Sequence, residues 1–166
     1  MLNIYTKLPL PKSLLLHVDG GCQPKNPGGV VTAGWVIYDK ETNETLVEEG
    51  KVIRDGGPEA TNNFGEYSSL GLALTYLKNQ KWKGNITIKA DSKLLVEQVN
   101  NRWKCKVSHL IELRQKIWEL LQDLSLELTN EQTCELIHVR REFNKRPDEL
   151  CRLAYEEYSS NKKETK

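Results

Sequence analysis

The chain has 166 residues, with 24 basic against 23 acidic side chains and a formal net charge of +1. This length suits one domain, and the balanced charge excludes a polybasic tail protein and an acidic disordered chain. No apolar run reaches the roughly 18 residues that a membrane span requires, and the N-terminus has no signal-peptide pattern. We therefore expect a soluble, cytoplasmic protein.

The first third of the chain predicts three strands. Residues 1–12 contain two prolines and predict a leader that lies on the surface or frays. Regular structure begins at Ser13, where SLLLHVDG is typical of a buried strand that ends in a glycine turn. Residues 30–39 and 44–53 are β-rich and separated by a short turn, so they predict an antiparallel hairpin.

The rest of the chain predicts helices that alternate with strands. We expect helices that begin near Thr61, Asp91, Val107 and Lys145, and strands over 85–90 and 133–139. Ser108 is the predicted N-cap of the third helix. The polar residues 159–166 predict a disordered tail, which leaves 13–158 as the folded domain. Three antiparallel strands followed by this alternation predict an α/β fold, one mixed sheet with helices on both faces.

Four carboxylates stand out because they lie at strand ends or helix starts. They are Asp19, Glu66, Asp91 and Asp148. Such positions can converge at one edge of a sheet, where clustered negative charges repel each other and divalent cations stabilise them. Oxygen ligands without His or Cys favour Mg²⁺ or Mn²⁺ over zinc. Taken singly, Asp91 could be a helix N-cap and Asp148 could interact with a helix dipole.

The residues around these acids form an ordered set of motifs. They are DGGCQPKNPGG at 19–29, TNNFGEY at 61–67, ADS at 90–92 and NKRPDEL at 144–150. In this order, and over most of the chain, they resemble the motifs of type 1 ribonuclease H. The resemblance implies a ribonuclease H-like, five-stranded mixed sheet in the order 3-2-1-4-5. It also implies endonucleolytic hydrolysis of the RNA strand of RNA–DNA hybrids, which leaves 5′-phosphate and 3′-hydroxyl ends.

The resemblance also implies a role for each acid. Asp19 would bridge two Mg²⁺ ions, with Mn²⁺ as the alternative metal. Asp148 would help to hold the ion that activates the attacking water, while Glu66 and Asp91 would hold the ion that stabilises the leaving oxygen. Two cations about 4 Å apart suit an in-line phosphoryl displacement.

Short amides and exposed backbone suit recognition of the RNA 2′-hydroxyl in a wide minor groove. By the same resemblance, Asn26 and Asn62 are candidates for minor-groove and RNA-strand contacts. Gly20 and Gly21 would let the backbone approach the RNA closely.

Two further features bear on substrate binding. Thr61 and Asn63 resemble a pocket that binds a DNA phosphate, although Thr61 could instead be a helix N-cap. Residues 78–106 hold eight basic against two acidic side chains, enough to bind phosphates if one face collects them. Within this segment, Trp103 could stack on a nucleotide or pack against a helix.

The chain departs from the family pattern at two points. It lacks the long basic insertion that many members carry after the third acid, and so resembles the shorter, archaeal-type branch. His138 precedes the last acid on a strand rather than in a flexible loop, so we interpret it as structural. Arg141 or Glu142 would line the site instead.

Two other classes of function remain open from the sequence. A nucleic-acid-binding module with this fold could have lost turnover, but clustered acids near phosphate gain nothing in binding alone. The second alternative is a nuclease domain of a retroelement polyprotein. The initial Met and the lack of a polymerase segment favour a free-standing protein instead. We expect a monomer that binds an RNA–DNA hybrid, with no membrane and no obligate protein partner.

Overall fold

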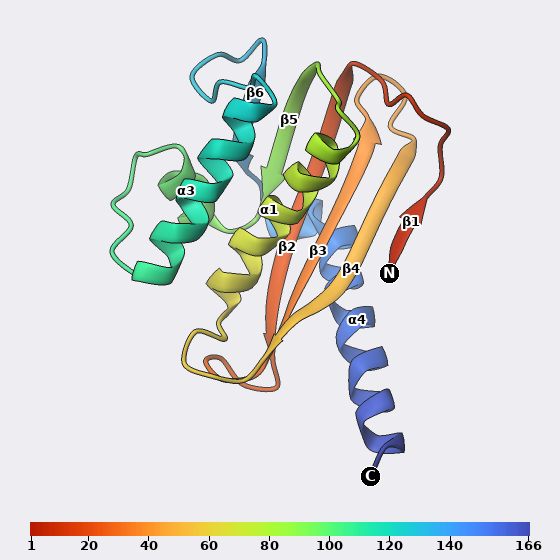
Figure 1. Cartoon of the computed structure of the whole chain (residues 1–166), viewed down its shortest axis with the longest axis vertical. Coiled ribbons are helices and arrows are strands. Elements are labelled where there is room, and N and C mark those ends of the chain that lie inside the picture. Colours follow the sequence, from red (N-terminus) through yellow and green to blue (C-terminus); the bar gives the residue numbers. More distant parts are fainter.

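Six strands form one mixed sheet in the computed structural model, which describes residues 1–166 (Figure 1). They are β1 (Leu2–Ile4), β2 (Ser13–Gln23), β3 (Val30–Asp39), β4 (Thr45–Asp55), β5 (Asn85–Ala90) and β6 (Cys134–His138). Their order is β1-β4-β3-β2-β5-β6. The pairs β1–β4, β4–β3 and β3–β2 are antiparallel, whereas β2–β5 and β5–β6 are parallel. The expected five-strand order is confirmed, and β1 adds a sixth strand at one edge.

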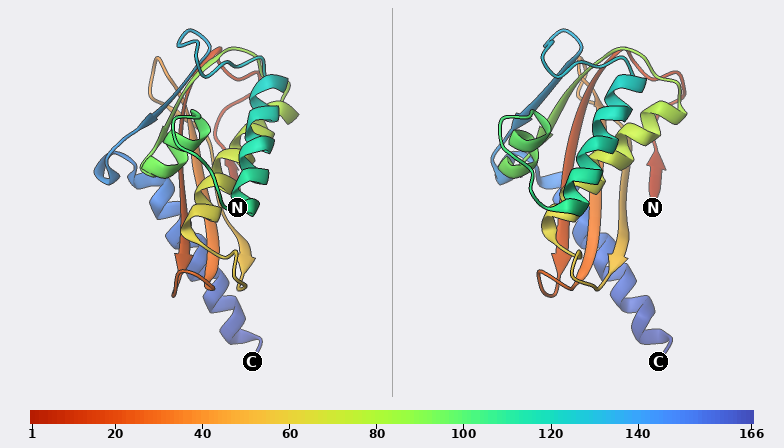
Figure 2. Two further views of the ribbon diagram at one scale, coloured as in Figure 1. Left: turned by 90° about the vertical axis from the view of Figure 1, so that its left-hand side faces the viewer. Right: turned by 60° about the vertical axis from the view of Figure 1, so that its left-hand side comes forward.

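Four helices cover the sheet on both faces (Figure 2). They are α1 (Asn62–Asn79), α2 (Lys93–Val99), α3 (Ser108–Asp123) and α4 (Lys145–Glu164), with a 3-10 turn over Arg141–Phe143. Adjacent residues of β3 contact opposite layers, because side chains alternate along a strand. The Trp35 ring lies 5.4 Å from that of Tyr76 in α1, while a Cβ on Gly34 would lie 2.3 Å from the Pro147 carbonyl oxygen in α4.

The expected N-terminal leader is partly wrong, because residues 2–4 form β1. Leu2, Asn3 and Ile4 pair with Glu49, Glu48 and Val47 of β4. Without this short strand, β4 would present an edge of unpaired backbone groups. The two prolines lie after the strand, where they do not interrupt its pairing.

The expected disordered tail is also wrong, because α4 continues to Glu164. Two side chains of its second half, Tyr158 and Lys162, each lie 2.6 Å from the Asp55 carboxylate at the end of β4. The predicted N-cap of α3 shifts by one residue: Val107 is the cap, and no side chain caps this helix.

The core lies between the sheet and the layer of α1 and α3. Leu14, Leu16 and Val18 of β2 are fully buried there against Leu70 and Leu74 of α1. None of the helices is long and apolar enough to cross a membrane.

The site depends on a difference in strand length. β5 pairs with β2 only as far as Ala90, which lies opposite Val18. β2 continues past this point to Gln23, so this stretch of β2 has β3 beside it but no longer β5. Beyond the end of β5, side chains from both faces of the sheet can therefore meet beside β2.

Candidate active site

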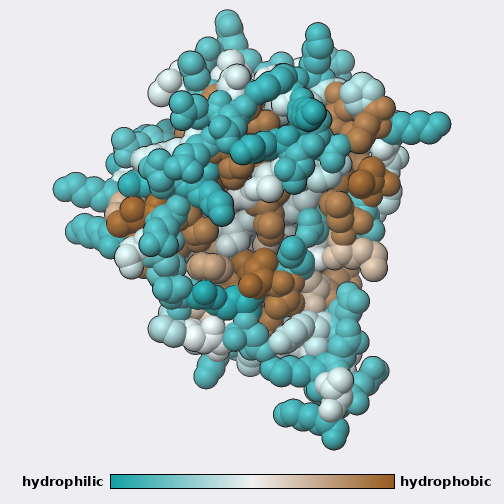
Figure 3. Space-filling view, viewed as in Figure 1, coloured by the Kyte–Doolittle hydropathy of each residue, from teal (hydrophilic) through white to brown (hydrophobic).

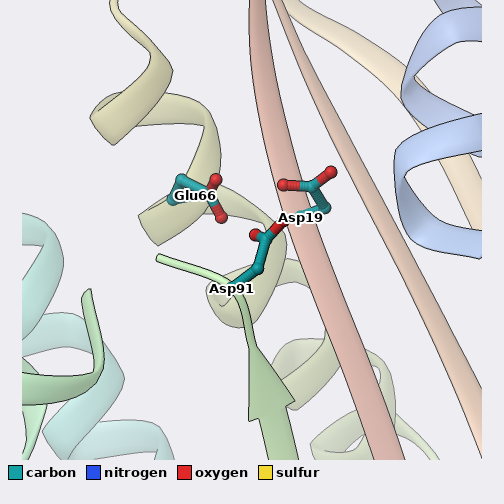
Figure 4. Close-up of side chains that lie close together, drawn as sticks. All are labelled: Asp19, Glu66 and Asp91. Atoms are coloured by element: carbon teal, nitrogen blue, oxygen red, sulfur yellow. The ribbon is translucent and has the colours of Figure 1, made fainter. Parts of the chain in front are cut away.

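Asp19 and Asp91 lie side by side because of strand register. Val18 and Ala90 are the last pair that joins β2 to β5, and an acid follows each of them. Figure 4 shows both carboxylates directed toward the same space, beyond the end of β5. The N-cap of α2 is Ser92, whose hydroxyl accepts from the Leu95 amide at 3.1 Å. The alternative of Asp91 as a structural cap is therefore wrong.

Glu66 reaches the same space from α1 because two glycines let the helix approach β2. A Cβ on Gly20 would lie 2.1 Å from the carbonyl carbon of Gly65, and one on Gly65 would lie 2.7 Å from the Thr32 carbonyl oxygen. No other residue fits either position without a shift of the backbone. Gly20 thus has a structural role beside its proposed contact with RNA.

The three carboxylates form a compact, buried set. One oxygen each from Asp19, Glu66 and Asp91 lies within 4.8 Å of the other two. Asp19 is 5% and Glu66 is 8% exposed, and Glu66 Oε2 is buried without a hydrogen-bond partner. Burial, and then the charge of Asp91, raise the pKa of Asp19 to about 8. Burial, and then the charge of Asp19, raise the pKa of Glu66 well above its ordinary value.

This donor set fits a hard divalent cation. The three side chains offer only oxygen atoms, which Mg²⁺ and Mn²⁺ prefer. No basic side chain forms an ion pair with Asp19 or Glu66. A bound cation would therefore neutralise charges that the protein leaves uncompensated.

The fourth predicted acid, Asp148, lies at the rim. It is exposed, in the first turn of α4, and does not belong to the compact set. Its charge still contributes to the raised pKa of Asp19, so Asp148 lies near the three clustered acids.

Asn144 fixes the start of α4, a role that we did not predict. Its side chain is 1% exposed, and its Nδ2 donates to the Val18 carbonyl oxygen at 2.8 Å. Its Oδ1 lies 3.0 Å from His17 Nδ1. Asn144 thus ties the helix that carries Asp148 to the residue before Asp19. Its place in the NKRPDEL motif, four residues before the acid, was the available signal.

Two more predicted residues lie near Asp91. Arg141 Nε is 3.8 Å from an Asp91 carboxylate oxygen, although the Arg141 side chain is 90% exposed. Glu142 is instead within 3.9 Å of Arg140. His138 ends β6, and its Nε2 lies 3.2 Å from the Asp91 carbonyl oxygen.

Four of the six predicted substrate contacts lie at the start of α1 or bond to it, whereas Gly20 and Gly21 lie on β2. Asn26 Oδ1 accepts from the Asn62 amide at 3.2 Å, and both side chains are exposed. The Thr61 hydroxyl accepts from the Phe64 amide at 3.1 Å, so Thr61 is the N-cap. Since a hydroxyl also donates, its hydrogen can still reach a phosphate oxygen. Asn63 is half-buried beside it.

The basic segment 78–106 uses part of its charge within the protein. Three of its eight basic residues bond to other groups of the chain: Lys78, Lys83 and Arg102. Trp103 is 44% exposed, and the Lys93 ammonium lies 5.8 Å from its ring centre. The ring is therefore partly exposed beside α2, and its stacking on a nucleotide stays a prediction.

Fold and site together define a ribonuclease H-like α/β protein. The family described as reverse transcriptase-like matches residues 17–154, so the chain belongs to that family. A curated relative named ribonuclease H, from Prochlorococcus marinus (strain NATL2A), is 34% identical over 112 residues. The match covers 62% of this chain and 63% of that relative, less than two thirds of its length.

Solved structures of similar fold include two that are called RNase H1. The protein of Halobacterium salinarum is 26% identical, with a TM-score of 0.74, and the alignment covers 87% of this chain and 98% of that one. LC11-RNase H1, in complex with an RNA/DNA hybrid, is 28% identical with a TM-score of 0.73 and the same coverage. The N-terminal RNase H domain of a Mycobacterium tuberculosis protein, at 24% identity and a TM-score of 0.76, supports the fold alone. The resemblance to type 1 ribonuclease H is thus confirmed.

Proposed function

We propose that this protein is a metal-dependent endonuclease that hydrolyses the RNA strand of RNA–DNA hybrids. The observation that carries the proposal is the set of Asp19, Glu66 and Asp91. One carboxylate oxygen from each lies within 4.8 Å of the other two, and neither Asp19 nor Glu66 forms an ion pair with a basic side chain. The hybrid bound in the complex of LC11-RNase H1 supports the substrate class.

The chemistry of these side chains is suited to phosphodiester hydrolysis. Asp19, Glu66 and Asp91 would hold two Mg²⁺ ions, or Mn²⁺, with Asp148 as a further ligand from the rim. When bound, such ions polarise the phosphate, lower the pKa of water and neutralise developing charge. The burial of Asp19 and Glu66 limits access of bulk water, which strengthens electrostatic interactions there.

Attack of water at phosphorus would break the bond to the 3′ oxygen of the upstream nucleotide. The proton released by water then balances the proton taken up by the leaving oxygen. The upstream fragment keeps a 3′-hydroxyl, and the downstream fragment keeps a 5′-phosphate.

The residues at the start of α1 would select the hybrid. The amides of Asn26 and Asn62 can both donate to and accept from a 2′-hydroxyl, which only the RNA strand carries. Thr61 and Asn63 would bind a phosphate of the DNA strand, and Gly21 would allow close approach of the RNA.

A cleavage assay on a hybrid with separately labelled strands tests this proposal. Each strand is followed with Mg²⁺, with Mn²⁺ and with a chelator, and double-stranded DNA and single-stranded RNA serve as controls. We expect metal-dependent cuts in the hybridised RNA alone. A folded protein that binds the hybrid but cuts nothing with either metal would instead be a binding module.

A further inference from the structure

A second surface collects lysines from distant parts of the chain. A hollow of about 320 Å³ lies between the loop over 24–29 and the second half of α4. Its charged lining consists of four lysines and one aspartate: Lys25, Lys162, Lys163, Lys166 and Asp55. We call this hollow the lysine pocket. The end of α4 that forms one wall projects from the body of the protein and is hydrophilic (Figures 1 and 3).

Asp55 orders the lysine pocket without neutralising it. Its carboxylate accepts from Lys162 Nζ and from the Tyr158 hydroxyl, each at 2.6 Å, which ties α4 to the end of β4. Lys25, Lys163 and Lys166 form no ion pair within 4.0 Å. Three lysine side chains without an ion-pair partner therefore surround a hollow whose walls are held in place.

The lysine pocket lies on the same side of α4 as Asp148. Asp148, Tyr155 and Lys162 are seven residues apart in turn, two helical turns at each step, and so share one stripe of the helix. At 1.5 Å per residue, Lys162 is about 21 Å along the helix from Asp148. The stripe thus leads from the candidate active site to the lysine pocket.

The loop over 24–29 makes the same connection on the opposite wall. It carries both Lys25 and Asn26, and Asn26 Oδ1 accepts from the Asn62 amide at the start of α1. The Gly28 amide also donates to the Ala60 carbonyl oxygen at 2.8 Å. The proposed RNA contacts and the lysine pocket are therefore neighbours on one ordered loop.

We propose that the lysine pocket binds the phosphate backbone of the hybrid beyond the cleavage site, a role that rests on the proposed function. Spread positive charge with aromatic neighbours, here Tyr155 and Tyr158, is typical of nucleic-acid surfaces. A single small anion fits less well, since the C-terminal end of a helix presents carbonyl oxygens and partial negative charge. This surface supplies phosphate contacts in a chain without the basic insertion.

Hybrid binding by a charge-reversed variant tests the proposal. Lys163→Glu/Lys166→Glu is compared with Lys12→Glu/Lys40→Glu, which makes the same charge change at exposed positions near the opposite end of β2 and β3. Both are made in an Asp19→Asn background to prevent cleavage. The dissociation constant is measured over a range of salt, for a short hybrid and for hybrids extended at one end or the other.

We expect Lys163→Glu/Lys166→Glu to weaken binding about tenfold, only for the hybrid extended toward α4. The slope of log affinity against log salt should fall by about 2, one unit for each lost phosphate contact. Lys163→Gln/Lys166→Gln, which avoids new repulsion and spares the helix end, should lower the same slope. Circular dichroism verifies that each variant is folded.

Four outcomes would overturn the proposal. An equal loss of hybrid affinity in the Lys12→Glu/Lys40→Glu control would show that the effect comes from the net charge of the protein and not from the lysine pocket. Equal loss on the short hybrid would place the effect elsewhere than the lysine pocket. Unchanged binding of the extended hybrid, by a protein whose parent cuts hybrids, would remove the lysine pocket and leave the proposed function intact. A parent that neither binds nor cuts hybrids would overturn both.

Discussion

Glu48 in β4 and Glu66 in α1 are both buried carboxylates, 2% and 8% exposed, but their surroundings differ. Glu48 lies 2.9 Å from Arg146 Nε, and it also accepts from the Tyr5 hydroxyl at 2.9 Å. The bond to Arg146 holds the pKa of Glu48 below its ordinary value. Glu66 has one buried oxygen without a partner, and burial together with the Asp19 charge raises its pKa.

The contrast shows what this fold does with a buried acid. Where Glu48 joins β4 to the start of α4, the chain supplies an arginine and a tyrosine. At Glu66 and Asp19 it supplies further negative charge. Uncompensated buried charges cost stability, so they persist where they serve a function. The proposed binding of a cation by Glu66 and Asp19 would explain this difference, and four changes test it.

The largest expected effect is on cleavage. Asp19→Asn removes the proposed central oxygen ligand. Loss of a residue that only orients a metal ligand already lowers metal affinity or activity about 10–100-fold. We expect the cleavage rate to fall by more than about a hundredfold. In the absence of metal, the variant should unfold at a temperature no lower than the parent, because a repulsive charge is gone. Parent-like cleavage would refute the role of Asp19.

The next effect is on stability. Glu48→Gln leaves Arg146 without its buried partner, and a lost charged hydrogen bond costs about 1–3 kcal/mol. Urea denaturation measures this free energy of unfolding. The exposed Glu44→Gln in the adjoining turn is the matched control and should change it by less than about 0.5 kcal/mol. Equal losses of unfolding free energy in Glu48→Gln and Glu44→Gln would show that the ion pair of Glu48 with Arg146 does not stabilise the fold.

The two regions should also respond oppositely to pH. The pKa of Asp19 is raised from 3.8 to about 8, so its contribution to stability is complete below 3.8 and lost as pH rises toward 8. The pKa of Glu48 is lowered, so its contribution is present above its ordinary 4.5 and lost as pH falls through the lowered value. Since protons compete with cations, Mg²⁺ should raise the unfolding temperature more at pH 8 than at pH 5. An equal rise at both pH values would contradict this.

The smallest effect concerns Arg141. Its guanidinium is 3.8 Å from Asp91 but 90% exposed, and exposed ion pairs contribute about 0–1 kcal/mol. Arg141→Gln should therefore change the free energy of unfolding by less than about 1 kcal/mol. A loss as large as that of Glu48→Gln would show that Asp91 has a structural partner after all.

The sequence pattern predicted the parts of this protein that depend on local signals. The expected glycine turn after Asp19 is wrong, because β2 continues through Gly20 and Gly21 to Gln23. The buried strand that begins at Ser13 and the cap at Thr61 were both predictable, because apolar spacing marks the first and a capping hydroxyl marks the second. The contact of Gly20 with Gly65, which brings Glu66 beside Asp19, was not. It joins two distant segments through backbone alone, so no side-chain pattern marks it.

The same reason explains the missed features at the chain ends. The pairing of Arg146 with Glu48 spans 98 residues, and that of Lys162 with Asp55 spans 107. In a short window of sequence, such partners cannot be distinguished from ordinary polar surface residues. The second half of α4 and the Glu48 pair therefore became visible only in three dimensions.

A titration with Mn²⁺ tests the central claim most directly, since it measures the cation without any substrate. The parent, Glu66→Gln and Glu48→Gln are compared by calorimetry at pH 7.5. We expect the parent and Glu48→Gln to bind Mn²⁺ with equal affinity, and Glu66→Gln to bind at least about tenfold more weakly. If Glu66→Gln bound Mn²⁺ as the parent does, the buried carboxylates would not be the cation site.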